Sequence, residues 1–175
     1  MATDLFRPAD EVGDRYLWVG QMTPYKRADL AVDAFNALGL PLLMVGEGEM
    51  AAELRRRAGP NIEFAPRLGF DGLRAAYARA RALVFTAEED FGIVPVEAMA
   101  SGRPVLAYGR GGALDSVAPG TTGLFFAEQS AEALIEGVRA MERWLPGFDP
   151  EAAVAQARRF SPERFDRGIM DALDA

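Results

Sequence analysis

The sequence predicts an α/β fold: a doubly wound parallel sheet of about six strands, with helices on both faces and extra helices at the C-terminal end. Two observations lead to it. Short apolar segments alternate with longer amphipathic segments along most of the chain, as in repeated strand–helix units joined by right-handed crossovers. Several of the apolar segments are hydrophobic at nearly every position, so their strands need cover on both faces of the sheet.

The predicted strands are short apolar runs bounded by turn residues. The first two, "YLWVG" and "PLLMVG", each end in glycine, and the later runs are rich in the branched and aromatic residues that favour strands. We expect strands at 16–20, 41–46, 61–65, 82–86, 104–108 and 123–127.

The segments between these strands carry apolar residues at helical spacing, so the whole succession is Rossmann-like. Ser161 and Pro162 suit the N-cap and first position of a final helix. We expect helices at 26–38, 49–58, 70–80, 93–101, 112–118 and 130–144, followed by two helices without an intervening strand at 149–159 and 161–173.

Composition limits the class of protein. With 175 residues, of which 50% are hydrophobic and 26% charged, the chain can build the core of one ordinary domain. No apolar stretch approaches the roughly 20 residues of a membrane-spanning helix. Cysteine is absent, and the N-terminus lacks the basic and apolar segments of a secretion signal. We therefore expect a cytoplasmic protein.

Charge and residue usage exclude further classes. A net charge of -7 without a basic tract argues against a nucleic-acid partner. The densest basic run, "LRRRAG" at 54–59, is expected to be a solvated helix face. The chain has no histidine, which removes the commonest general base and metal ligand, and it has no Asp-x-Asp pair to hold a divalent ion. Nothing in the sequence predicts a metal site.

The stretch "TPYKRADL" contains Lys26, the only lysine among 19 basic residues. One lysine could fall there by chance, so its identity alone proves nothing. Its place is more informative, because ligands of doubly wound folds bind in the loops that follow the strands, and Lys26 follows the first strand.

The stretch "GEGEMA" at 46–51 matches the G-x-G-x-x-A fingerprint of dinucleotide-binding proteins. The match is weak. It follows the second strand, and the next strand ends in "EFAPRL", without the acidic residue that would hold the ribose of NAD. An NAD-dependent enzyme is therefore a distant alternative.

The most informative stretch is "TAEEDFGIVPVEAMASGRPVLAYGRGGALDSV" at 86–117. A strand ends there, an acidic loop follows, and a helix begins near Gly92. The backbone N–H groups of Phe91, Gly92 and Ile93 would point out of the helix N-terminus and form an anion site. Glu89 and Glu97 flank this turn. Their spacing means little alone, but with "EAMASGRPV" and the Gly-Gly loop it forms a specific pattern.

This stretch resembles the donor-binding half of retaining glycosyltransferases of family 4, which have the GT-B fold. The shared features are a Glu, seven residues, a second Glu, then "EAMA-x-G-x-PV" and a Gly-Gly loop. The similarity covers roughly Tyr16 to Phe126, including "TPYKR" and "VGEGE". The stretches "PYKRADLAVDAFN" and "EEDFGIVPVEAMASGRPV" resemble those of enzymes that transfer hexoses such as mannose, which implies a GDP-sugar as the first candidate donor and a UDP-sugar as a close second. No cofactor beyond this substrate is implied.

The resemblance also implies residue roles. Lys26 would contact the donor diphosphate and Glu89 the sugar hydroxyls, which makes these two the candidate catalytic residues. Glu97 would bind the ribose hydroxyls. The full implied donor-binding set is Gly20, Gln21, Lys26, Gly46, Arg67, Leu68, Glu89, Phe91, Gly92, Ile93 and Glu97, in which backbone near Arg67 and Leu68 would meet the base.

Two features depart from the family pattern. Gln21 stands where the family commonly has an arginine, so the diphosphate loses one cation, and Arg27 or Arg110 could replace it. Family enzymes also have an N-terminal domain that carries the acceptor site.

Residues 1–14 resemble the end of the interdomain linker, and residues 15–175 the donor domain. We therefore expect that this chain binds a nucleotide sugar but transfers nothing without the missing acceptor domain. Peripheral membrane association of the full enzyme is left open. The alternative is a stand-alone nucleotide-binding or partner-binding subunit without catalytic activity.

Overall fold

The computed structural model describes residues 3–162 and 164. Six short strands form one sheet, and each lies within a predicted strand segment. They are β1 (Tyr16–Val19), β2 (Leu42–Val45), β3 (Ile62–Ala65), β4 (Leu83–Phe85), β5 (Val105–Tyr108) and β6 (Gly123–Phe126).

The strand order is β3-β2-β1-β4-β5-β6, and every neighbouring pair is parallel. Leu17 of β1 aligns with Leu43 of β2 on one side and with Leu83 of β4 on the other. The chain therefore adds β2 and β3 on one side of β1, and then adds β4, β5 and β6 on the other side. This order confirms the predicted Rossmann-like fold, and it puts the switch point of the sheet between β1 and β4.

The helices follow the predicted order. The α-helices are α1 (Ala28–Leu38), α2 (Ala51–Arg57), α3 (Phe70–Arg79), α4 (Ile93–Ala100), α5 (Ala113–Ser116), α6 (Ala131–Trp144) and α7 (Pro150–Ala157), and the 3-10 turns are η1 (Thr3–Leu5), η2 (Pro24–Lys26), η3 (Leu145–Gly147) and η4 (Arg158–Phe160). The helix expected at 161–173, with its proposed start at Ser161, lies almost entirely outside the described residues.

Several helix boundaries differ from the prediction by one or two residues, and the start of α1 is the one that bears on the site. The helix expected from residue 26 begins at Ala28, because Arg27 adopts a left-handed backbone conformation with φ of 52°. This conformation costs a non-glycine residue about 1–2 kcal/mol. Lys26 consequently lies in the separate 3-10 turn η2 rather than in the first turn of α1.

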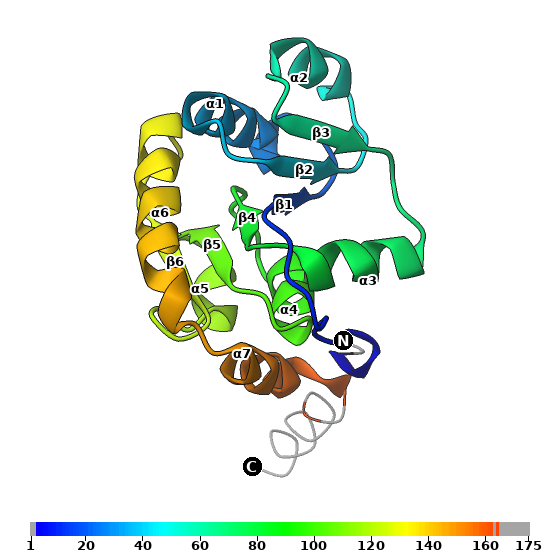
Figure 1. The fold of residues 1–175 in the computed structure, drawn as a ribbon, viewed down its shortest axis with the longest axis vertical. Coiled ribbons are helices and arrows are strands. Elements are labelled where there is room, and N and C mark those ends of the chain that lie inside the picture. The colour runs from blue at the N-terminus through cyan, green and yellow to red at the C-terminus, as the bar shows by residue number, and fades with distance from the viewer. Residues whose placement is uncertain (1–2, 163, 165–175) are drawn as a thin grey trace.

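Helices cover both faces of the sheet, as the doubly apolar strands predict. Adjacent residues of β1 point to opposite faces: Trp18 belongs to a core with α1, α2 and α6, whereas Leu17 belongs to a core with α3, α4 and α7. Figure 1 shows α1 and α6 together along one side of the sheet, with α3, α4 and α7 along the other. No helix in the described part is long and apolar enough to span a membrane.

The N-terminal segment packs against the body of the domain. Phe6 is only 7% exposed and belongs to the core beneath α3 and α4. Its ring meets Phe70 and Tyr77 edge-on, with a centroid separation of 5.8 Å in each case. Part of the segment expected to be a linker remnant thus shares its packing with α3.

A partly buried polar network joins elements at the amino-terminal end of the strands. The Tyr16 hydroxyl donates to Oε1 of Glu142 at 2.6 Å. Arg81 donates to both carboxylate oxygens of Glu142, from Nε and Nη2, at 2.6 Å each. These bonds hold the pKa of Glu142 below its ordinary value, whereas burial and the nearby carboxylate raise the pKa of Tyr16. The network ties β1, the entry to β4 and α6 together.

Replacing Glu142 should reveal this network as a pH-dependent contribution to stability. The folded-state pKa of Glu142 is depressed, so its contribution is present above the unfolded-state pKa and is lost as the pH falls through the folded-state value. We expect Glu142→Gln to lower the free energy of unfolding by about 1 kcal/mol near neutral pH. The effect is modest because the side chains of Glu142 and Arg81 are both partly exposed to solvent. The difference from the parent protein should shrink in acid, below about pH 4.

Urea unfolding at several pH values measures both effects. Glu136→Gln on the same helix is the control, because Glu136 forms only an exposed ion pair with Arg139. A loss for Glu142→Gln that equals the control, or that does not shrink in acid, would contradict the assignment.

Candidate functional site

The two predicted catalytic residues meet at the switch point of the sheet. Lys26 comes from η2, which follows β1, and Glu89 comes from the loop between β4 and α4. Nζ of Lys26 donates a hydrogen bond to Oε1 of Glu89, and the two side chains are 18% and 21% exposed. Nζ also lies 5.0 Å from the centroid of the Tyr25 ring. The single lysine is therefore held between a carboxylate and an aromatic face, with part of its surface open.

A chain of hydrogen bonds fixes the backbone beneath Lys26. Nε1 of Trp18 donates to Oγ1 of Thr86 at 3.0 Å, and this hydroxyl donates to the carbonyl oxygen of Lys26 at 2.7 Å. Nε2 of Gln129 donates to the carbonyl oxygen of Thr86 at 2.9 Å. The sequence-based reasoning missed Thr86, whose one signal is a hydroxyl directly after an apolar strand.

A cavity of about 540 Å³ lies around this ion pair. The predicted site residues in its lining are Lys26, Glu89, Phe91, Gly92 and Ile93, and the other lining residues are Tyr25, Glu88, Asp90 and Val94. The amino end of α4 reaches this cavity, because Gly92 is its N-cap and Ile93 its first residue. Free N–H groups at a helix start attract anions, so the cavity offers an ammonium and backbone donors for a negative group.

The Gly-Gly loop after β5 holds the Glu89 loop in place. The N–H group of Gly112 donates to the carbonyl oxygen of Glu89 at 2.7 Å. A side chain at position 112 would bring its Cβ to 2.3 Å from the carbonyl oxygen of Asp90, so the close approach of the two loops requires glycine.

A second cavity, of about 590 Å³, lies at the carboxyl ends of β1, β2 and β3. Its predicted site residues are Gly20, Gln21, Gly46, Arg67 and Leu68, and it is completed by Val19, Val45, Glu47, Phe70 and Leu73. Gly46 has φ of 139°, and a Cβ there would come to 1.9 Å from the carbonyl oxygen of Gly20. The "GEGEMA" fingerprint thus packs the end of β2 against the end of β1.

The arginines that could compensate for Gln21 differ in their surroundings. Arg27 is engaged by Asp29, to which Nε and Nη2 donate at 3.2 Å each. Arg110 is exposed and lines neither cavity. Arg67, by contrast, shares the second cavity with Gln21. A cation from the loop after β3 therefore lines the same cavity as Gln21.

Glu97 lines neither cavity. It lies on α4 and is half-buried, and the hydroxyl of Tyr77 donates to its Oε2 at 2.7 Å. Burial raises the pKa of Glu97, and the bond from Tyr77 opposes this rise. The sequence-based reasoning missed Tyr77, because a tyrosine at apolar helical spacing looks like an ordinary core residue.

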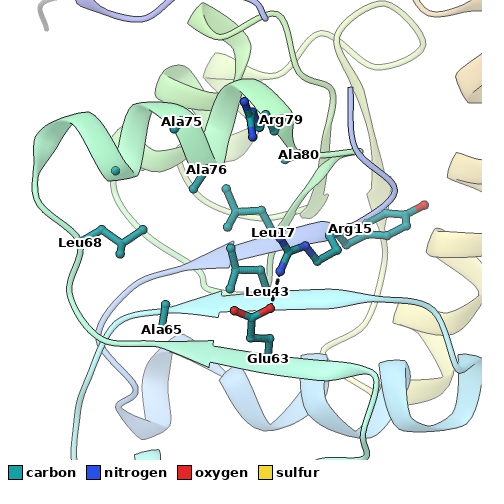
Figure 2. A pocket seen from close by; sticks show the side chains of 12 residues that line it. Arg15, Leu17, Leu43, Glu63, Ala65, Leu68, Ala75, Ala76, Arg79 and Ala80 are labelled. Carbon is teal, nitrogen blue, oxygen red and sulfur yellow. Dashed lines mark hydrogen bonds and ion pairs between the residues drawn. The ribbon is translucent and has the colours of Figure 1, made fainter. Parts of the chain in front are cut away.

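A third hollow, of about 320 Å³, lies between α3 and the sheet rather than at the strand ends. Figure 2 shows Leu17, Leu43 and Ala65 on the strands facing Ala75 and Ala76 of α3, with the ion pair of Arg15 and Glu63 at its edge. Small side chains on α3 leave this space unfilled. Leu68 is the one predicted site residue in its lining, so the hollow is a neighbour of the second cavity and not its centre.

Within the described residues, no group of three or more histidine, cysteine or acidic side chains could hold a metal ion.

Comparisons with known proteins identify relatives of this chain. A GDP-mannose-dependent alpha-mannosyltransferase of Mycolicibacterium smegmatis is 40% identical over 109 residues, which is 61% of this chain and 28% of that protein. An uncharacterized glycosyltransferase of Methanocaldococcus jannaschii is 29% identical over 127 residues, which is 70% of this chain and 36% of that protein. The chain thus spans well under half the length of these curated relatives.

Two solved structures share the fold. The sucrose-phosphate synthase of Thermosynechococcus elongatus superposes with a TM-score of 0.79 at 26% identity, over 99% of this chain and 50% of that one. The HepE protein of Anabaena, solved in complex with UDP-glucose, superposes with a TM-score of 0.83 at 21% identity, over 99% of this chain and 55% of that one.

The sequence model of the family described as glycosyl transferases group 1 matches residues 13–143, which include all six strands and every predicted site residue. The chain therefore belongs to the glycosyl transferases group 1 family.

Proposed function

We propose that this chain is the donor-binding half of a retaining glycosyltransferase that transfers a hexose from a GDP- or UDP-sugar. The observation that carries the proposal is the contact of Lys26 with Glu89 beside the amino end of α4. Besides the carboxylates of Glu88 and Asp90, which also line this cavity, Lys26, Glu89 and the backbone donors at the amino end of α4 converge there. These are the groups that a diphosphate joined to a polyhydroxylated sugar requires.

The ion pair suggests how the donor is accommodated. In the structure Lys26 and Glu89 neutralise each other. A nucleotide sugar placed between them gives Lys26 a phosphate and Glu89 the sugar hydroxyls, so both charges keep a partner. A nucleoside diphosphate without the sugar would leave Glu89 unpaired. The arrangement therefore favours the complete donor.

The same groups support the chemistry of transfer. Breaking the glycosidic bond places additional negative charge on the departing diphosphate, and a fixed ammonium with helix-end N–H groups stabilises that charge as it develops. The acceptor's proton can pass to the leaving phosphate oxygen, which suits a chain without histidine. The acceptor groups and the closure of the cleft belong to a second domain, so this chain alone binds the donor without transferring its sugar.

The second cavity suits the nucleoside. It adjoins the ends of β1 to β3, and both Arg67 and Gln21 line it, so we propose that Arg67 supplies part of the charge that Gln21 lacks. The mannosyltransferase relatives favour guanine as the base, and the fold shared with the UDP-glucose complex keeps uracil as the second candidate.

Nucleoside diphosphate binding should not depend on a divalent ion, because Lys26 and backbone N–H groups supply the phosphate partners. We expect isothermal titration of the chain with GDP and with UDP to give the same affinity in magnesium and in EDTA. GMP is the control, since it lacks the second phosphate and should bind more weakly. Binding that disappears with the chelator would contradict this mode of phosphate recognition.

The two glutamates should affect different parts of the donor. Glu97→Gln should weaken the binding of GDP and of GDP-mannose by the same amount, about 1–3 kcal/mol, because both ligands carry the ribose. Glu89→Gln should weaken the binding of GDP-mannose, because it removes the partner of the sugar hydroxyls. The affinity for GDP should stay the same or increase, because Lys26 loses its competing carboxylate. Glu132→Gln, an exposed change on α6, is the control. Equal losses for both ligands in both variants would remove the separate roles.

The single lysine permits a direct test of phosphate contact. Lys26→Ala should weaken diphosphate binding by about tenfold or more, and Lys26→Arg should restore only part of it, because a planar guanidinium keeps the charge but not the geometry. Arg110→Ala is the control for long-range charge. In the parent protein, nucleotide should protect the Lys26 side chain from an amine-reactive label, read by mass spectrometry. Full affinity in Lys26→Arg, or labelling that nucleotide does not slow, would count against a phosphate ligand.

A further inference from the structure

We propose that Tyr77 is a positioning residue for the donor ribose: its hydroxyl fixes the Glu97 carboxylate so that the free oxygen of Glu97 faces the ligand. This inference rests on the proposed function, because it assumes that Glu97 binds the ribose hydroxyls.

The two oxygens of Glu97 have different environments. Oε2 accepts the hydrogen bond from the Tyr77 hydroxyl at 2.7 Å. Within the described part of the chain, Oε1 has no hydrogen-bond partner, and it is not among the buried side-chain atoms without one, so it is open to solvent. One oxygen is therefore committed to the protein and the other remains available to a ligand.

Fixing one oxygen has a physical consequence for the other. The terminal torsion of a glutamate is broad, so an unrestrained carboxylate turns freely. A ribose presents two adjacent hydroxyls that need an acceptor at a definite place. The Tyr77 bond restricts the rotation of the carboxylate before the ligand arrives. Less side-chain conformational entropy is therefore lost when the ligand binds. The same bond also opposes the rise that burial causes in the pKa of Glu97.

Tyr77 is itself held rigidly. It lies on α3, is fully buried, and belongs to the core between α3 and α4. The ring of Phe6 packs edge-on against it at 5.8 Å and an interplanar angle of 78°. Figure 1 shows the N-terminal segment passing beside α3 and α4, where these contacts form. The position of Glu97 is thus set by two neighbouring elements, α3 and the N-terminal segment.

The chain contains a matched control at the other end of the sheet. Tyr16 is also fully buried, and its hydroxyl also donates to a glutamate, Glu142, at 2.6 Å. Tyr16→Phe removes the same kind of bond at the amino-terminal end of β1, away from both cavities. It should lower the melting temperature without changing how the protein distinguishes ribose from deoxyribose.

The test compares GDP with 2′-deoxy-GDP and 3′-deoxy-GDP. The parent protein should bind GDP more tightly than either deoxy ligand, and Glu97→Gln should reduce that preference. Tyr77→Phe keeps the ring and removes the hydroxyl, so we expect it to reduce the preference by about three- to tenfold, the range for one ordinary hydrogen bond. Melting temperatures are measured beside the affinities for all variants.

The outcomes distinguish a failure of the positioning role of Tyr77 from a failure of the proposed function. If Glu97→Gln loses the ribose preference and Tyr77→Phe keeps it, the positioning role is wrong and the proposed function stands. If Tyr77→Phe weakens GDP and the deoxy ligands equally, as a structural change would, the positioning role is also wrong. A parent protein without ribose preference, or one that binds neither GDP nor UDP, contradicts the proposed function itself.

A second variant covers the case in which Tyr77→Phe does not fold. Phe6→Leu leaves the hydroxyl in place but loosens the ring against which Tyr77 packs. We expect a smaller reduction of the ribose preference than in Tyr77→Phe. A preference equal to that of the parent would count against the rigid placement of Glu97 through Tyr77.

Discussion

The pairing of β1 with β4 is the constraint on which the rest of the site depends. These strands are far apart in the sequence, and they become parallel neighbours only because the sheet reverses its winding between them. Their following loops therefore leave the same edge of the sheet side by side, which brings Lys26 to Glu89 across 63 positions. The side-chain hydrogen bonds from Trp18 to Thr86 and from Thr86 to the carbonyl of Lys26 continue the contact between the two chain segments beyond the end of β4.

The number of accepted hydrogen bonds separates Glu142 from the two proposed donor ligands, Glu89 and Glu97, better than side-chain exposure does. Glu142 receives three side-chain hydrogen bonds from Tyr16 and Arg81, so both of its oxygens are committed to the fold. Within the described residues, Glu89 and Glu97 accept one side-chain bond each and keep a second oxygen without a partner. Glu142 is nevertheless more exposed than Glu89. Unused acceptor capacity, rather than accessibility alone, marks the carboxylates that can serve a ligand.

The fold was predictable because its signals are local. Apolar runs, loop glycines and helical spacing located the six strands and the helices of the described part. The features that escaped prediction depend on distant partners. Thr86 acts on Lys26 across 60 positions, and Tyr77 acts on Glu97 across 20. Arg27 interrupts a continuous helical pattern through its backbone, and no periodicity reveals a single left-handed residue. The donor roles of the predicted residues stay predictions, whereas the distribution of all of them except Glu97 over two cavities is a finding.

The close approach of Gly112 to the Glu89 loop has a consequence for how this scaffold can diversify. Since the N–H group of Gly112 bonds to the carbonyl of Glu89, and no side chain fits between the loops, the two segments form one mechanical unit. An insertion in either loop would displace the other. Changes in what this cavity binds should therefore arise from exchanges of exposed side chains such as Tyr25 and Ile93, with loop lengths kept constant.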